Sequence, residues 1–133
     1  MSNEKVLVVG GAGYIGSHTN KMLNQAGHET LVLDNLSYGH SDFVKWGELI
    51  EGDMADENLL DRIFTQYHIK AVMHFSAFIA VGESVQKPGL YYDNNVSKTV
   101  TLLNKMVQHN VPYFIFSSTC AIMGEPQYLP LDE

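Results

Sequence analysis

The stretch VLVVGGAGYIGSH, residues 6–18, decides the expected fold. Its first four residues are apolar and predict a buried strand. Gly10, Gly13 and Gly16 follow as GxxGxxG, which suits a tight turn, close approach of a pyrophosphate and close packing of the next helix on the strand. The N-terminus of that helix would offer free N–H groups to an anion. The stretch predicts a strand–turn–helix unit with a phosphate site, although a plain tight turn has the same pattern.

Beyond this stretch, short apolar runs alternate with amphipathic segments about every twenty residues, which is typical of a parallel sheet with helices on both faces. The last of these segments carries Val96, Val100, Leu103 and Val107 on one helical face. We expect strands at 6–9, 30–33, 48–51, 71–75 and 113–117, and helices at 14–25, from near residue 56, and from about 88 to 109. The strand at 113–117 would keep an apolar unpaired edge, which indicates a fragment.

Composition and charge exclude several classes of protein. The chain has 133 residues, 45% of them hydrophobic and 17% charged, as in one soluble globular domain. Its formal net charge of −7 argues against nucleic-acid or anionic-lipid partners. We find no secretory signal and no apolar run near the roughly 18 to 20 residues that span a bilayer. Cys120 is the single cysteine and no histidine spacing suits a metal, so we expect a cytoplasmic protein with no metal site.

Carboxylates follow the second and third predicted strands. Asp34 ends the run TLVLD, where a carboxylate can accept both ribose hydroxyls of an adenosine. It would repel a 2′-phosphate, and the next basic residue is Lys45, so NAD is favoured over NADP. Asp53 and Met54 could meet the adenine ring. The glycine loop lacks GK[ST], which argues against a P-loop nucleotidase, but a methyltransferase that binds S-adenosylmethionine fits these residues too.

Six stretches, taken in order, resemble the N-terminal part of the UDP-glucose 4-epimerase (UDP-galactose 4-epimerase) family, within the extended short-chain dehydrogenase/reductase superfamily. The resemblance covers essentially the whole chain and argues against a methyltransferase. It implies an α/β, doubly wound Rossmann-type fold with about five strands present. Residues 1–133 would form a partial NAD-binding domain, and the C-terminal substrate domain would be absent. The stretches are GGAGYIGSH (10–18), LDNLSYGH (33–40), EGDM (51–54), MHFSAFIAVGESVQKP (73–88), YYDNNV (91–96) and FIFSSTCAIMG (114–124).

The resemblance also implies individual roles. Thr119 matches the catalytic Ser/Thr, which hydrogen-bonds the sugar hydroxyl that is oxidised. Asn94 matches a position near the cofactor and the substrate. The cofactor-binding residues would be Gly10, Gly13, Tyr14, Ile15 and Gly16 along the pyrophosphate, Asp34, Asn35, Ser37 and Gly39 around the adenosine ribose, Asp53 and Met54 at the adenine, and Phe75, Ser76, Ala77 and Asn94 on the nicotinamide side.

The implied reaction interconverts UDP-glucose and UDP-galactose through tightly bound NAD, which takes hydride from C4 of the hexose and returns it on the other face. The family's base is a tyrosine with a lysine four residues later, and no YxxxK occurs in this chain. We therefore expect the parent protein to be active and this chain alone to be inactive. Ile79, Cys120 and Met123 also depart from the family's usual residues around the site.

Other functions remain open from the sequence. A related NAD-dependent nucleotide-sugar epimerase, a 4,6-dehydratase or a non-catalytic NAD-binding module would share these motifs. A UDP-hexose substrate is expected for the full-length protein. A homodimer could form through the helix expected at 88–109.

Overall fold

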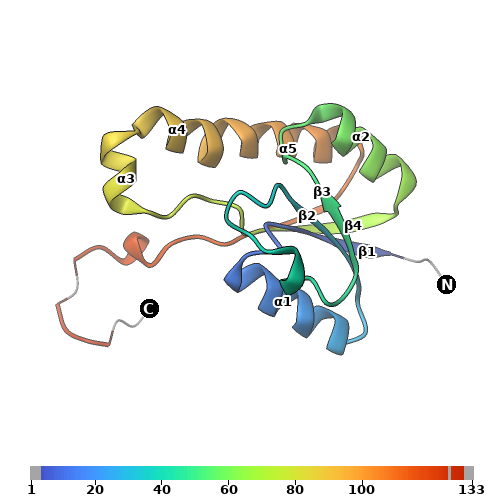
Figure 1. Ribbon diagram of the computed structural model, residues 1–133, viewed down its shortest axis with the longest axis horizontal. Coiled ribbons are helices and arrows are strands. Elements are labelled where there is room, and N and C mark those ends of the chain that lie inside the picture. The colour runs from blue at the N-terminus through green and yellow to red at the C-terminus, as the bar shows by residue number, and fades with distance from the viewer. Residues whose placement is uncertain (1–3, 126, 131–133) are drawn as a thin grey trace.

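The computed structural model describes residues 4–125 and 127–130. Its centre is a five-stranded parallel sheet with the order β3-β2-β1-β4-β5 (Figure 1). Strand order runs outward in both directions from β1, as in a doubly wound dinucleotide-binding sheet, so the predicted Rossmann-type class is confirmed. The strands are β1 (Lys5–Val9), β2 (Glu29–Asp34), β3 (Glu48–Glu51), β4 (Ile69–His74) and β5 (Tyr113–Phe116).

Helices lie on both faces of this sheet (Figure 1). α1 (Tyr14–Gln25) covers one face of β1 and β2, while α2 (Glu57–Gln66) and α5 (Lys98–Gln108) pack together on the other. No helix among the described residues is long and apolar enough to cross a bilayer. The shorter elements are the 3₁₀ turns η1 (Ser41–Phe43) and η3 (Cys120–Met123), the helices α3 (Val81–Gln86) and α4 (Pro88–Tyr92), and the π-helical turn η2 (Asp93–Ser97).

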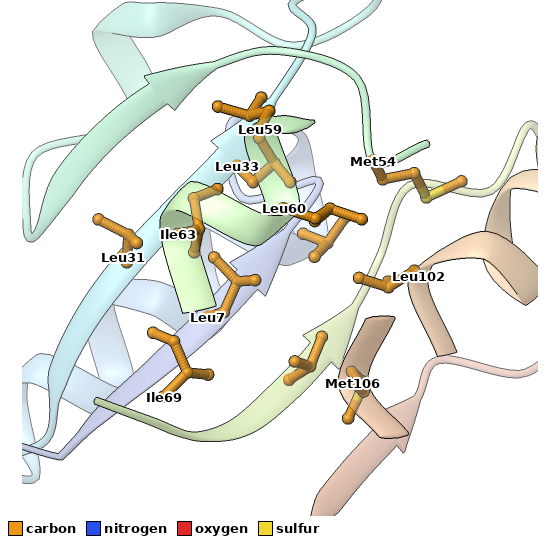
Figure 2. Packing of buried hydrophobic residues seen from close by; sticks show 12 residues of the cluster. Leu7, Leu31, Leu33, Met54, Leu59, Leu60, Ile63, Ile69, Leu102 and Met106 are labelled. Carbon is orange, nitrogen blue, oxygen red and sulfur yellow. The ribbon is translucent and has the colours of Figure 1, made fainter. Parts of the chain in front are cut away.

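The main core lies between the sheet and the α2–α5 pair (Figure 2). Leu7, Leu31 and Leu33 point from β1 and β2 towards Leu60 of α2 and are fully buried or nearly so. The alternate strand residues, Val8 and Val32, face α1 and are also buried. Burial on both faces explains why these strands read as continuous apolar runs.

The predicted strands are all present, and none of their ends moves by more than two residues. The first predicted helix coincides with α1, and Gly27 ends it at φ +88°. Asp56 caps α2 by accepting the N–H of Leu59 at 3.0 Å. Local signals were therefore sufficient for these elements.

The helix expected as one unit from about Pro88 to His109 is nearly as predicted: Pro88 starts α4, and the helical backbone continues without a break through η2 and α5 to Gln108. The sequence did not predict that its middle turn, η2, is π-helical. The apolar stripe formed by Val96, Val100, Leu103 and Val107 meets the core only through Leu103, which is partly buried against it. Val96, Val100 and Val107 are largely exposed, with Val107 at 78%, and the buried face of α5 instead carries Leu102 and Met106. The stripe had the helical period, but period alone does not say which face meets the sheet.

Candidate functional site

A hollow opens at the carboxyl ends of β1, β2, β3 and β4. This edge is the switch point of the sheet, because the chain leaves β1 towards β2 on one side and β4 lies on the other. Its lining comes from the glycine turn after β1 and from the loops that follow the other three strands. Open parallel sheets bind their ligands at this location.

The glycine turn leaves no room for side chains. Gly10 has φ +79°, and a Cβ there would lie 2.7 Å from the backbone of Phe75 and Ser76. A Cβ on Gly16 would collide with the carbonyl oxygen of Gly10, so this glycine lets α1 pack onto the turn. Gly13 is the N-cap of α1, and no side chain in the described part of the chain caps it. The first-turn N–H groups therefore keep their capacity to bind an anion.

Asp34 is the buried carboxylate of the hollow. Its Oδ2 accepts the N–H of Ala12 and its Oδ1 accepts the N–H of Leu36, both at 2.9 Å. Each carboxylate oxygen has a further lone pair for a hydroxyl donor. The two bonds tie the glycine turn to the loop after β2 and orient the carboxylate in the lining.

Asp53 lines the hollow after β3 and forms an ion pair with Lys98 of α5. Burial raises the pKa of Asp53, but hydrogen bonds from Lys98 and from the N–H of Ala55 outweigh it, so the pKa lies below its usual value. The residue is therefore an anion at neutral pH. Met54, its neighbour, contributes its sulfur to the lining and accepts a hydrogen bond from Ser76 Oγ at 3.0 Å.

The loop after β4 forms the opposite wall. Phe75, Ser76 and Ala77 line the hollow there, and Asn94 reaches it from η2 with only 4% of its surface exposed. Asn94 Nδ2 donates to the carbonyl oxygen of Ser76 at 3.0 Å. This wall therefore combines an aromatic ring with amide and hydroxyl groups.

His74 ends β4 beneath this wall and is buried. Its Nε2 lies 3.1 Å from Thr99 Oγ1, as in an interior hydrogen-bonded histidine, while Nδ1 has no partner among the described residues. Burial lowers the pKa of His74, so the imidazole is neutral at pH 7. It supports the wall and does not line the hollow.

Most of the predicted site residues meet in this hollow, but five do not line it. Tyr14 and Ile15 lie at the start of α1 with 76% and 57% of their surfaces exposed, and Gly16 packs behind the turn. Ser37 donates its N–H to Asn35 Oδ1 at 3.1 Å outside the lining. Thr119 is exposed after β5, where its Oγ1 accepts the N–H of Ala121 at 3.2 Å. The hollow brings together Gly10, Gly13, Asp34, Asn35, Gly39, Asp53, Met54, Phe75, Ser76, Ala77 and Asn94.

Sequence reasoning missed two aromatic residues and one lysine. Tyr38 and Phe78 line the hollow from opposite loops, and their ring centroids lie 5.3 Å apart at a steep angle. Each lies in the sequence directly beside predicted site residues, so its position in the same loop could have identified it. Lys98 has no such signal, because it lies far along the chain from its partner Asp53.

The residues of this hollow fit a dinucleotide. The tight glycine turn, the uncapped N-terminus of α1 and the buried Asp34 lie together at the switch point, as a bound pyrophosphate and ribose require. A family model described as the NAD dependent epimerase/dehydratase family matches residues 6–133. This chain belongs to that family.

Individual relatives agree with this assignment. The chain is 50% identical over 133 residues to a UDP-glucose 4-epimerase of Rhizobium meliloti (strain 1021), covering all of this chain and 40% of that protein. A crystal structure of UDP-glucose 4-epimerase from Brucella ovis in complex with NAD superposes with a TM-score of 0.91 at 48% identity, covering 98% of this chain and 40% of the other. The Bifidobacterium longum enzyme in complex with NAD+ and UDP gives a TM-score of 0.88 at 40% identity, covering 97% of this chain and 41% of that one.

The resemblance to UDP-glucose 4-epimerases is thus confirmed, as is NAD as the cofactor of the family. The chain spans about 40% of the length of these relatives.

Proposed function

We propose that this chain is the NAD-binding part of a UDP-glucose 4-epimerase. The observation that carries the proposal is the meeting of the glycine turn with Asp34 at the switch point of the sheet, within a chain half identical to such an enzyme. We also place the protein in the cytoplasm, which the free, exposed thiol of Cys120 supports.

In this proposal each wall of the hollow holds one part of the cofactor. The N–H groups at the start of α1 bind the pyrophosphate, and Asp34 accepts hydrogen bonds from the adenosine ribose. Asp53 and Met54 lie beside the adenine. The loop after β4 and Asn94 orient the nicotinamide ring. When bound, NAD+ supplies a hydride acceptor for C4 of the hexose.

Thr119 would hold the hydroxyl group of the sugar at C4. The proton of that hydroxyl needs a base, and the chain contains no tyrosine with a lysine four residues later. We therefore propose that the 133-residue chain represents a partial domain, that it binds NAD and that it does not turn over UDP-sugars by itself. A longer polypeptide with a substrate domain would complete the site.

Calorimetry with NAD and NADP tests the cofactor part of the proposal. We expect the chain to bind NAD in preference to NADP, because a 2′-phosphate would meet the Asp34 carboxylate. Asp34→Asn keeps an acceptor for only one of the N–H groups of Ala12 and Leu36 and loses the charge, so it should weaken NAD binding about tenfold and reduce the preference over NADP. Asp42→Asn, an exposed substitution outside the lining of the hollow, is the matched control. Equal affinity for both cofactors in the unaltered chain would contradict the assignment.

A product assay tests the substrate. A polypeptide that carries this chain and continues past residue 133 should interconvert UDP-glucose and UDP-galactose without added NAD, since the reaction returns the cofactor to its starting state. Conversion of another nucleotide sugar, or loss of water from the hexose, would instead indicate a sister epimerase or a 4,6-dehydratase.

A non-catalytic NAD-binding module is the second candidate, because the residues that line the hollow would serve it equally well. Binding of NAD without binding or turnover of UDP-sugars by the natural polypeptide would establish this alternative. Binding and turnover of UDP-sugars by the natural polypeptide therefore distinguish the two candidates.

We further infer a homodimer through the exposed stripe of Val96, Val100 and Val107. These side chains lie outside the main core on a continuous helical segment, and Val107 is the most exposed of them. Apolar stripes of this kind mark interaction surfaces. Val100→Glu should shift the sedimentation coefficient to that of a monomer, whereas Thr101→Glu on the same helix, one position away from the stripe, should leave it unchanged.

A further inference from the structure

The loop at residues 75–80 forms a wall of the hollow without helix or strand structure of its own. Its first residue is fixed to the sheet, because the N–H of Phe75 donates to the carbonyl of Val9 at 2.8 Å. Further along, Ser76, Ala77 and Phe78 line the hollow. The positions of these three residues therefore depend on the contacts that hold residues 76–78 of the loop.

Asn95 holds it by two hydrogen bonds to one residue. Its Oδ1 accepts the N–H of Phe78 at 2.8 Å, and its Nδ2 donates to the carbonyl oxygen of Phe78 at 3.0 Å. A side-chain amide offers one acceptor and donors in a fixed plane, so it can pair with both backbone groups of a residue as a neighbouring strand would. No other natural side chain of this length provides the same pair except a protonated aspartic acid.

The π-helical turn η2 explains why this amide reaches the loop. Lys98 donates its N–H to the carbonyl of Asp93, five residues earlier, which widens the turn. Asn94 and Asn95 both contact the loop from this turn: Asn94 Nδ2 donates to Ser76 O at 3.0 Å and to Asn95 Oδ1 at 2.9 Å. Turns of this type occur often at functional sites.

Through Phe78, the loop also contacts aromatic residues on the other side of the hollow. The ring of Phe78 contacts Tyr38 edge to face at 5.3 Å, and it contacts Tyr91 of α4 at 5.7 Å. Tyr38 follows β2, close to Asp34. A shift of Phe78 would therefore move aromatic groups on both walls.

We propose that Asn95 is a positioning residue, which fixes the backbone of Phe78 and thereby sets the affinity of the hollow for NAD. This proposal rests on the proposed function only in the identity of the ligand. Asn95 does not line the hollow, so it acts through the loop and not by touching the cofactor.

Two substitutions of Asn95 separate this role from a general effect on folding. Asn95→Asp keeps the acceptor for the N–H of Phe78 and loses the donor to its carbonyl, whereas Asn95→Leu loses both. We expect the dissociation constant for NAD, measured by calorimetry, to rise about five- to thirtyfold in Asn95→Leu and by a smaller factor in Asn95→Asp. Asn104→Leu and Asn104→Asp, at an exposed position of α5, are the matched controls and should change it less than twofold.

Hydrogen exchange of the Phe78 amide, followed by NMR, gives a readout that does not require NAD. Exchange should be faster in Asn95→Leu than in the unaltered chain and nearly unchanged in Asn95→Asp, with thermal melting recorded for every variant. A lower melting temperature with an unchanged NAD affinity and unchanged Phe78 exchange would overturn the proposal. If the unaltered chain binds no NAD, the proposed function fails, while the exchange data still decide whether Asn95 positions the loop.

Discussion

Gly16 shows at the scale of one residue how closely the turn and the helix approach each other. A methyl group at this position would meet the Gly10 carbonyl oxygen and the Cα of Gly11, which are both backbone atoms and cannot rotate away. We expect Gly16→Ala to lower the free energy of unfolding by about 1–3 kcal/mol and to weaken NAD binding. Urea denaturation and calorimetry would measure the two effects.

Gly89→Ala is the matched control for this substitution. Gly89 lies in α4, and a Cβ there would meet nothing within 4 Å among the described atoms. Alanine should therefore be neutral or stabilising by up to about 1 kcal/mol, because it restricts the unfolded chain. Equal losses of stability in both variants would contradict the close approach at Gly16.

At the scale of whole elements, α2 and α5 contact each other through both apolar and charged residues. Beside the apolar core, the two helices are joined by a charged cluster in which Lys105 Nζ lies 2.8 Å from Asp61 Oδ2 and 3.3 Å from Glu57 Oε2. His109 Nε2 lies 2.8 Å from Asp61 Oδ1. The hydrogen bond from Lys105, followed by that from His109, holds the pKa of the Asp61 carboxyl below its usual value.

This cluster predicts a pH dependence of stability. The carboxyl of Asp61 has a lower pKa in the folded than in the unfolded chain, so its contribution is fully present above the unfolded pKa of about 3.9 and is lost as the pH falls through the folded pKa. Asp61→Asn should therefore unfold at lower urea concentrations than the unaltered chain at pH 7, and the difference should vanish in strong acid. Asp42→Asn should show little difference at either pH. A difference for Asp61→Asn that stays constant from neutral to acid pH would show that the charge of Asp61 is not its cause.

At the scale of the whole molecule, the two faces of the sheet are covered unequally. α2 and α5 bury one face, whereas α1 covers the opposite face only over β1 and β2 (Figure 1). Ile115 of β5 lies on the α1 side, in register with Met73, and is 47% exposed. No strand of the described residues pairs with the outer edge of β5, which leaves its backbone groups unpaired there, and the exposed side chain of Ile115 leaves apolar surface on the α1 side in contact with water.

Because the two faces of the sheet are covered unequally, we expect substitutions on them to lower the free energy of unfolding by different amounts. Leu31→Ala, at a fully buried position, should lower the free energy of unfolding by about 2–5 kcal/mol, whereas Ile115→Ala should cost about 1 kcal/mol or less in this chain. In a longer polypeptide the cost of Ile115→Ala should rise if the additional residues cover this face. Guanidinium denaturation of both proteins would measure the change. An equal cost for the two substitutions in the 133-residue chain would show that β5 is already covered.

Local patterns were sufficient to predict the strands, α1, the cap of α2 and the glycine turn, because each depends on residues close together in the sequence. They were insufficient for α3 and for the π-helical turn, since Val81–Gln86 carries no distinctive period and the turn depends on how Asn94 and Asn95 bond to a loop earlier in the chain. The apolar stripe of Val96, Val100, Leu103 and Val107 shows the same limit. Its period was visible, but its direction depends on packing.

The order of the elements, the glycine turn, the acidic group after β2 and the family could all be predicted from the amino-acid sequence, because these follow from local chemistry and the order of motifs. Other features became visible only in the folded chain: which residues share the hollow, that Lys98 neutralises Asp53, that Tyr38 meets Phe78, and that Thr119 stays outside the lining. The physical reason is that these relations join segments far apart in the chain. Their distances are set by how helices and strands pack, and no local pattern records that packing.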